Sequence, residues 1–300
     1  MGDPRERRSA VGDGGLRKWW IGGCLGLLLL AVLVVVILAG LTWHSVGDAD
    51  PQESVRVQDP VTVVPGAPFK VTLELDTCEL YLEPAAPGEP LSIEARYDAN
   101  DYRIEEIVEN GIPGSYRLRF LVTSSRLITA IKQGIHGGQP QLRIRIPVDT
   151  PLELSLLQRN GGAVVDLSRL HLLAADFDIE GAYLKLDANT PLEGRLERLT
   201  IRGGTGAILI DNLNRMNPSI IDAEFRMGEV HLDFRGEWES DSKIDLSLSL
   251  VDGVLRLPRD ASIEGLDTFV GTREGISEIP QPTLSFSVKT GRRTDLKVFE

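Results

Sequence analysis

The stretch GAVVDLSRLHLLAADFDIEGAYLKLD, residues 162–187, decides the fold class of this protein. It runs from a glycine through two short strands of alternating apolar and polar residues to a second glycine and a third strand. Alternation with a period of two is typical of half-buried β-strands. The stretch therefore predicts a repeated unit made of strands, and an all-β fold.

The same unit recurs through residues 148–300. A glycine opens a short strand at spacings of 19, 25, 22 and 25 residues, in Gly162, Gly181, Gly206, Gly228 and Gly253. Units of this length that cannot bury a face alone predict a solenoid. Each glycine is expected to mark a corner with positive φ or a close approach of neighbouring coils. An up-and-down sandwich is the competing fold, but its strands carry no recurring glycine corner.

The flanking regions are less regular. Residues 58–147 alternate as in Val71-Thr-Leu-Glu-Leu and predict an irregular N-terminal β region. Residues 123–139 place apolar side chains at partly helical spacing, which indicates a loop with one helical turn or a partner-binding insertion. Residues 283–299 predict a closing hairpin around Thr290-Gly291, which would cap the open end of the repeats.

The N-terminal part predicts one transmembrane helix over residues 19–43. No charged side chain occurs from Ile21 to Leu41, and a helix of that length spans about 30 Å, the thickness of the hydrocarbon core of a bilayer. Trp19, Trp20 and Trp43 stand at its ends, where indole rings favour the membrane interface. A cleaved signal peptide is the alternative, but its apolar region is about 7–15 residues long.

Charge predicts the orientation of this helix. The early basic residues all precede the span, so residues 1–18 are expected to be a cytoplasmic tail. Residues 44–57 form a polar stalk, and the domain beyond lies outside the cytoplasm, in the periplasm or at the cell surface. Gly22 and Gly26 form a GxxxG pair that would support a homo-oligomer, although glycine is frequent in membrane helices in general.

The domain after the span is acidic. Charges in residues 1–50 cancel, so the formal net charge of −12 belongs to residues 51–300. Binding of nucleic acid depends on clustered Lys and Arg, and nucleic acid is therefore not an expected partner. The expected partners are the membrane itself and another envelope protein.

The chain carries no motif for catalysis. His44, His136, His171 and His231 lack the spacing of metal ligands, and His231 should face solvent from a strand. No nucleophile elbow, phosphate-binding loop or dinucleotide fingerprint occurs. The sequence thus predicts no catalytic residue and no cofactor, and a protein that is not an enzyme.

Acidic residues recur at strand ends, in Asp166, Asp187, Asp211 and Asp233. In a solenoid they would form a ladder along one edge, which suggests bound Ca²⁺ or paired carboxylates for acid and base chemistry. The simpler interpretation is that each aspartate caps a turn by accepting hydrogen bonds from backbone amides. The sequence therefore predicts that these aspartates cap turns, and they are only weak candidates for metal ligands.

Two further residues have structural interpretations. Trp238 is expected to pack in the core or at a corner, with exposure for glycan stacking as the alternative. Cys78 is the only thiol after the span, so no intramolecular disulfide can form there.

Three stretches resemble a group of bacterial envelope proteins with a toast-rack domain. They are Ile144-Arg-Ile-Pro147 with the following Asp149-Thr-Pro-Leu-Glu-Leu, the unit opened by Gly162, and the stretch from Gly228-Glu-Val-His-Leu-Asp to Gly253-Val-Leu-Arg-Leu-Pro. The resemblance implies a single-stranded, right-handed β-solenoid, often with a membrane anchor or signal peptide. Members of the group carry names such as adhesin or cell-wall-active antibiotic response protein, and the group has no established catalytic residues.

These features predict a membrane-anchored extracytoplasmic β-solenoid that acts as a scaffold or binding module at the bacterial cell envelope, with a role in sensing envelope stress. Two alternatives stay open. One is a surface adhesin. The other is a β-helical carbohydrate-active enzyme that uses the ladder of aspartates.

Overall fold

The computed structural model describes residues 68–109, 114–124, 139–266, 281–291 and 293–299. The chain divides into two units, Met1–Ala49 and Asp50–Glu300, and every described residue belongs to the second. The predicted membrane helix with Trp19, Trp20, Gly22, Gly26 and Trp43 lies outside the described residues, as does most of segment 123–139. Where the structure is described, no helix combines the length and the apolar character that crossing a membrane requires.

The described part of the chain is all-β, as predicted. Its strands are β1 (Phe69–Pro84), β2 (Ser92–Arg96), β3 (Tyr102–Glu109), β4 (Ser115–Val122), β5 (Gln141–Ile146), β6 (Leu152–Asp166), β7 (Leu172–Asp187), β8 (Arg198–Ile210), β9 (Ile220–Asp233), β10 (Ser242–Arg256), β11 (Ser262–Glu264), β12 (Thr283–Thr290) and β13 (Asp295–Phe299). A single helical turn, α3 (Leu213–Met216), connects β8 to β9. All of these strands belong to one sheet.

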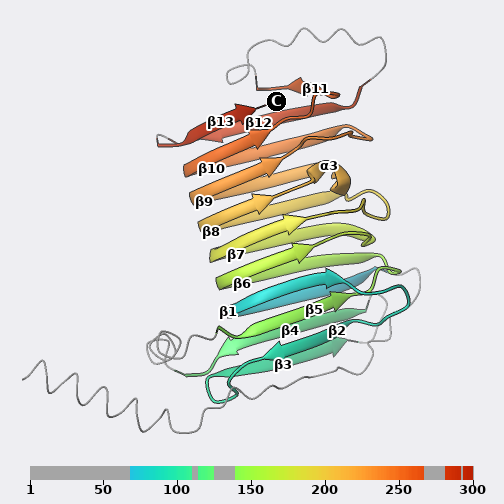
Figure 1. Ribbon diagram of the computed structural model, residues 1–300, viewed down its shortest axis with the longest axis vertical. Helices are drawn as coiled ribbons and strands as arrows, with labels where there is room; N and C mark the ends of the chain where they lie inside the picture. Colours follow the sequence, from blue (N-terminus) through green and yellow to red (C-terminus); the bar gives the residue numbers. More distant parts are fainter. Residues whose placement is uncertain (1–67, 110–113, 125–138, 267–280, 292, 300) are drawn as a thin grey trace, which may run out of the picture. The chain divides into compact units, whose positions relative to one another are not determined.

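Six long parallel strands form the centre of this sheet (Figure 1). They follow the order β1, β6, β7, β8, β9, β10, and each is 13 to 16 residues long. We call each of them a rung. Equivalent positions in successive rungs lie at Leu154, Ala175, Leu199, Ile221 and Ile244, so the offset from one rung to the next is similar but not constant. The stack includes β1, and it therefore begins well before residue 148, where the regular repeats were expected to start.

Each rung bends near its middle, at a position that we call the corner. In β6 the buried side chains are Leu152, Leu154 and Leu156 before the corner but Ala163 and Val165 after it, so the alternation changes phase. The half before the corner belongs to a first wall and the half after it to a second wall, which faces the viewer in Figure 1. The inward side chains of both walls build the core.

The pattern of burial follows directly from the alternating sequence. Inward positions such as Leu73, Phe177 and Ile201 are completely buried, and the outward neighbours are polar. Burying a large aliphatic or aromatic side chain stabilises the folded state by about 1.5–3 kcal/mol. Because consecutive rungs supply these side chains at the same positions, the core is continuous from β1 to β10.

Both ends of the stack are made of shorter strands. Next to β1, strand β4 pairs with its first half and β5 with its second half, both in parallel. Strands β3 and β2 then add antiparallel edges to β4 and β5. Next to β10, strand β12 pairs with the first half and β13 with the second half, again in parallel. The predicted C-terminal hairpin is therefore wrong, because β12 and β13 are two halves of one further rung.

The predicted glycine corners are only partly correct. Gly206 and Gly228 are paired in adjacent rungs and both have positive φ. A Cβ on Gly228 would lie 1.9 Å from the carbonyl oxygen of Gly206, so the rungs can approach only without a side chain there. Gly162, Gly181 and Gly253 do not have positive φ and do not occupy this column. At Gly181 the other expected cause applies, because a Cβ there would lie 3.1 Å from the carbonyl oxygen of Arg159 in β6.

Candidate functional site

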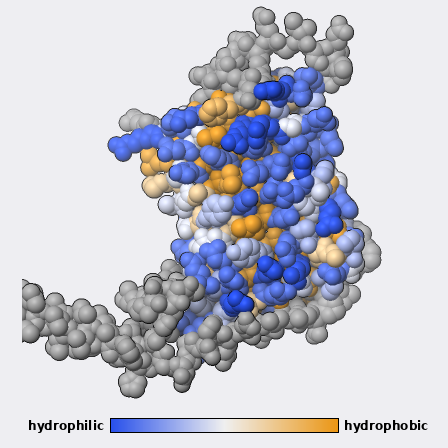
Figure 2. All heavy atoms as spheres, in the orientation of Figure 1, coloured by the Kyte–Doolittle hydropathy of each residue, from blue (hydrophilic) through white to orange (hydrophobic). Residues whose placement is uncertain are grey.

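A groove of about 760 Å³ lies at the corners of β7 to β10. The residues that define it are Glu180 from β7, Gly203 and Gly204 from β8, Arg226 and Met227 from β9, and Leu250 from β10. Hydrophobic atoms protrude at the edge where the strands turn, at the left of Figure 2, next to a hollowed part of the outline. The groove therefore lies on an exposed edge of the stack.

The glycine pair in β8 explains why a groove forms here. Outward position 204 lies between Glu180 and Arg226 in the neighbouring rungs, and Gly204 brings no side chain to it. A Cβ on Gly204 would lie 2.2 Å from the carbonyl oxygen of Glu180. On the inward side, the ring of Phe225 occupies the space beside Gly203, where a Cβ would lie 2.9 Å from its Cδ1 atom. Because Gly203 and Gly204 have no side chains, the backbone of β8 itself lines the groove.

Two exposed apolar side chains mark one end of the groove. Met227 is 50% exposed and Leu250 is 44% exposed, and the two residues are paired between β9 and β10. Large apolar side chains on a folded surface that are clustered next to a concave region are typical of interaction sites. The sequence analysis did not predict this pair. Alternation gave no signal for it, because Met227 stands two residues after Phe225 and continues the phase of the buried side chains.

The rim of the groove is charged. Arg202 Nη1 lies 3.0 Å from an oxygen of Asp176 and 3.9 Å from one of Asp178, and Arg226 Nε lies 3.4 Å from Glu224. Such exposed ion pairs are worth about 0–1 kcal/mol each, so a partner can rearrange them at little cost. The lining contains three carboxylates and two guanidinium groups, which leaves it slightly acidic.

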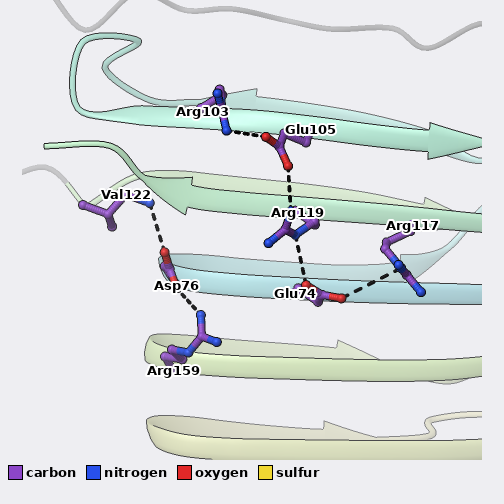
Figure 3. A network of polar contacts seen from close by, with 8 residues as sticks. All are labelled: Glu74, Asp76, Arg103, Glu105, Arg117, Arg119, Val122 and Arg159. Carbon is purple, nitrogen blue, oxygen red and sulfur yellow. Dashed lines mark hydrogen bonds and ion pairs between the residues drawn. The ribbon is translucent and has the colours of Figure 1, made fainter.

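A separate polar network lies on the first wall, toward the end of the stack formed by β3 (Figure 3). Arg119 on β4 donates to Glu74 on β1 at 3.1 Å and to Glu105 on β3 at 2.9 Å. Asp76 on β1 accepts hydrogen bonds from the backbone of β4 and from Arg159 on β6. These contacts connect four strands at one end of the stack. They account for a row of charges that would otherwise resemble a binding site.

The four predicted aspartates do form a column. Asp166 and Asp187 are paired between β6 and β7, and the registers of the following strands place Asp211 and Asp233 next in the same line. Arg256 on β10 pairs with Asp233 and ends the column. In the sequence these aspartates follow the glycines of their units by 4, 6, 5 and 5 residues. The distances differ because the glycines, not the aspartates, are out of register.

Two of the aspartates cap their own turns. Asp166 accepts a hydrogen bond from the backbone N–H of Ser168 at 2.9 Å, and Asp233 accepts one from the backbone N–H of Arg235 at 3.0 Å. The capping interpretation is therefore confirmed at these positions. Asp187 instead accepts a hydrogen bond from the side chain of Asn212 at 2.7 Å.

The carboxylates of the column differ in their acidity. Burial raises the pKa of Asp211, and the charge of Asp187 adds to the rise. Burial also acts to raise the pKa of Asp233, but hydrogen bonds from Arg235 and the charge of Arg256 outweigh it and hold that pKa below its ordinary value. Asp211 is therefore the more easily protonated of these two.

Metal ligands do not gather within the described ranges. No group of three or more His, Cys, Asp or Glu side chains there could hold a metal ion. His231 is exposed on β9, as predicted. The column of aspartates thus brings carboxylates into line without enclosing a position for an ion.

Trp238 and Cys78 are both buried. The indole Nε1 of Trp238 donates to the carbonyl oxygen of Phe234 at 2.8 Å, and the two rings stack with centroids 6.2 Å apart, so the predicted core position is confirmed. Burial raises the pKa of the Cys78 thiol far above its ordinary value, with smaller contributions from Glu79 and Asp76. Such a thiol is unreactive in the folded protein.

Comparisons with known proteins give no family. No family model matches the chain, and no curated protein matches it. Among solved structures, a protein from Clostridium sporogenes provisionally described as a cell adhesion protein is similar at 12% identity, with a TM-score of 0.39, and covers 83% of this chain and 99% of its own. A provisionally described adhesin from Bacteroides fragilis is similar at 11% identity, with a TM-score of 0.36 and coverages of 83% and 98%. One from Parabacteroides merdae has 10% identity, a TM-score of 0.24 and the same coverages.

Proposed function

We propose that this protein is a non-catalytic binding module at a bacterial cell envelope, which holds a partner protein in the groove at the corners of β7 to β10. The observation that carries the proposal is the exposed pair Met227 and Leu250 beside the open backbone of Gly204. Apolar side chains of a partner would cover this pair. The slightly acidic rim favours a partner segment that also carries Lys or Arg.

The proposed location follows from the sequence. Residues 19–43 would anchor the chain, with residues 1–18 in the cytoplasm and the all-β unit outside it. A partner bound in the groove would then report on conditions outside the membrane, such as envelope stress. Surface adhesion is an alternative function that is compatible with the same location. It predicts that protease added to intact cells cleaves the all-β unit, whereas cleavage only after permeabilisation excludes adhesion.

We further propose that the stacked rungs form a single-stranded, right-handed β-solenoid of the toast-rack kind. Parallel rungs that follow one another at similar offsets along the chain, each contributing one half to each wall, support this architecture. An experimental structure of the all-β unit would test the handedness. A left-handed path between successive rungs would contradict the proposal.

Crosslinking from the groove tests the binding function. A photo-reactive amino acid is placed at Met227 in the full chain and, as a matched control, at Asp222, which is exposed on the same strand outside the groove. Irradiation of living cells is expected to give a discrete adduct from position 227 and not from 222. Substitution Leu250→Asp should reduce that adduct, because it charges the apolar end of the groove. Identical adducts from both positions, or none from 227, would exclude the groove as the binding site.

The enzyme alternative has its own test. The variant Asp211→Ala with Asp233→Ala removes two members of the aspartate column without touching the groove. If the column were catalytic, cells with this variant would show the phenotype of a deletion. Under the binding proposal they retain the wild-type phenotype, and the melting temperature of the variant does not respond to calcium.

A further inference from the structure

The two ends of the second wall are complementary to each other. Strand β13 forms one end and β2 the other, and within the described residues β13 pairs only with β10 and β2 only with β5. We propose that copies of this chain associate head to tail, with β13 of one copy pairing antiparallel with β2 of the next. This proposal does not depend on the function of the groove.

Register is the first argument. A continuous column of paired residues runs from Lys297 in β13 through β10, β9, β8, β7, β6, β1 and β5 to Glu94 in β2. If a second copy continues the stack, its Glu94 takes the next position after Lys297. The neighbouring outward column then places Arg96 of that copy next to Asp295. Both cross-strand pairs unite opposite charges, which favours pairing of the strands.

Direction is the second argument. Strand β2 runs antiparallel to β5, and β5 is parallel to β1 and to the rest of the stack. Its free edge therefore meets β13 in an antiparallel arrangement, which is compatible with the register above. Both strands are five residues long, so they match along their full length.

The apolar positions agree with the same register. Leu296 and Val298 point into the core from β13 but are only partly buried, because no further described rung lies beyond them. In a second copy, Ala95 and Ile93 of β2 occupy the corresponding inward columns and are buried. Continuing the stack would therefore cover the open end of one core with the closed end of the next.

The first wall lacks these features. At one end, β11 already pairs with part of β12. At the other end, β3 places Glu106 at an inward position opposite Leu118. An inward charge and a covering strand are features that protect sheet edges from pairing. Association is thus expected through the second wall only, where no described strand covers the free edge of β2 or β13 and neither strand places a charge at an inward position.

Disulfide trapping tests the proposal in the full chain in detergent micelles. All variants carry Cys24→Ser, which removes one of the two native thiols. The other, Cys78, can stay because it is buried and unreactive. One preparation carries Arg96→Cys and another Asp295→Cys. Within one copy these positions are eight strand spacings apart, about 38 Å, which is far beyond the reach of a disulfide. A crosslinked dimer is expected when the two preparations are mixed under mild oxidation, and not from either alone.

Each other outcome overturns the proposal. Absence of a crosslink in the mixture excludes the pairing of β13 with β2. Dimers from one preparation alone, at the yield of the mixture, indicate that like ends associate. Circular dichroism of each variant confirms that it is folded.

Charge reversal tests the register. Lys297→Glu in the preparation with Asp295→Cys should lower the crosslinked fraction by about threefold or more, because it places two carboxylates opposite each other. Glu94→Lys in the other preparation should restore it. Arg198→Glu, an exposed reversal on the first wall, is the matched control and should change nothing. A crosslinked fraction that does not respond to Lys297→Glu contradicts the proposed register.

Discussion

Substituting Gly228 by alanine tests how closely the rungs approach each other at the corner. Gly228 has a φ of +122°, and a Cβ at this position would lie 1.9 Å from the carbonyl oxygen of Gly206 in the adjacent rung. The atom that it meets belongs to the backbone of a strand paired on both sides. The overlap therefore cannot be relieved by rotating a side chain, and β8 and β9 must separate at their corners.

The expected loss of stability has two parts. A non-glycine residue at such a positive φ costs about 1–3 kcal/mol in backbone strain. Forcing extra volume into a packed region costs about another 1–3 kcal/mol. We expect Gly228→Ala to lower the free energy of unfolding by about 4 kcal/mol, which corresponds to a fall in melting temperature of about 8–16 °C for a unit of this size.

Gly88→Ala is the matched control. Gly88 also has a positive φ, +80°, but a Cβ there would have no neighbour within 4 Å. Only the strain remains, about 1–2 kcal/mol. Thermal and urea unfolding followed by far-UV circular dichroism would compare the two variants. Equal losses in both would show that the contact between Gly228 and Gly206 contributes nothing, and would refute the reasoning.

Three further predictions concern single side chains. Asp211→Asn should stabilise the protein at neutral pH, by about 0.5 kcal/mol. Burial raises the pKa of Asp211, so the ionised form of this side chain destabilises the fold. The stabilisation by Asp211→Asn should therefore disappear as the pH falls through that raised pKa, because the wild-type carboxyl group then becomes neutral. Arg235→Gln should destabilise it at neutral pH by less than about 1 kcal/mol, a loss that vanishes in acid once Asp233, whose pKa is held low, is protonated. Unfolding in urea at several pH values would reveal either pH profile, and one that is flat would contradict it. Trp238→Ala should cost about 3–5 kcal/mol through a core cavity, and Trp238→Phe clearly less; equal losses in urea unfolding would contradict cavity formation.

Much of the fold could be predicted because its physical cause is local. Burying one face of a strand imposes a period of two on the sequence, and this period identified the strands around Leu73 and Leu184. Repetition of glycine and strand at similar spacing revealed that the units are stacked. The position of Trp238 also followed from a general rule, since a lone indole usually packs in a core.

Register could not be predicted because it is set by contacts between rungs. The offset from one rung to the next is not constant, since the turns between strands differ in length. Counting from glycines therefore misaligned the repeats, whereas the pairs in the sheet align Asp166 with Asp187. The hairpin at Thr290-Gly291 failed for a related reason. A turn glycine predicts a change of direction, but the strands on both sides find better partners in β10.

The groove escaped prediction for yet another reason. Its apolar end joins Met227 and Leu250, which belong to successive rungs and become neighbours only through the pairing of β9 with β10. Its hollow results from side chains that Gly203 and Gly204 lack. A single sequence shows such a site only when the register of the rungs is already known.

The place of β1 in the stack determines how the all-β unit would respond to tension. Strand β1 comes first among the described strands, yet it lies between β6 on one side and β4 with β5 on the other. A pulling force that enters through residue 68 must shear two sets of hydrogen bonds at once. The same force entering through residue 299 meets β13, which is held by β10 alone among the described strands. When the unit is tethered on its N-terminal side and pulled at residue 299, β1 would therefore stay paired, and the rungs would separate one at a time from the C-terminal end.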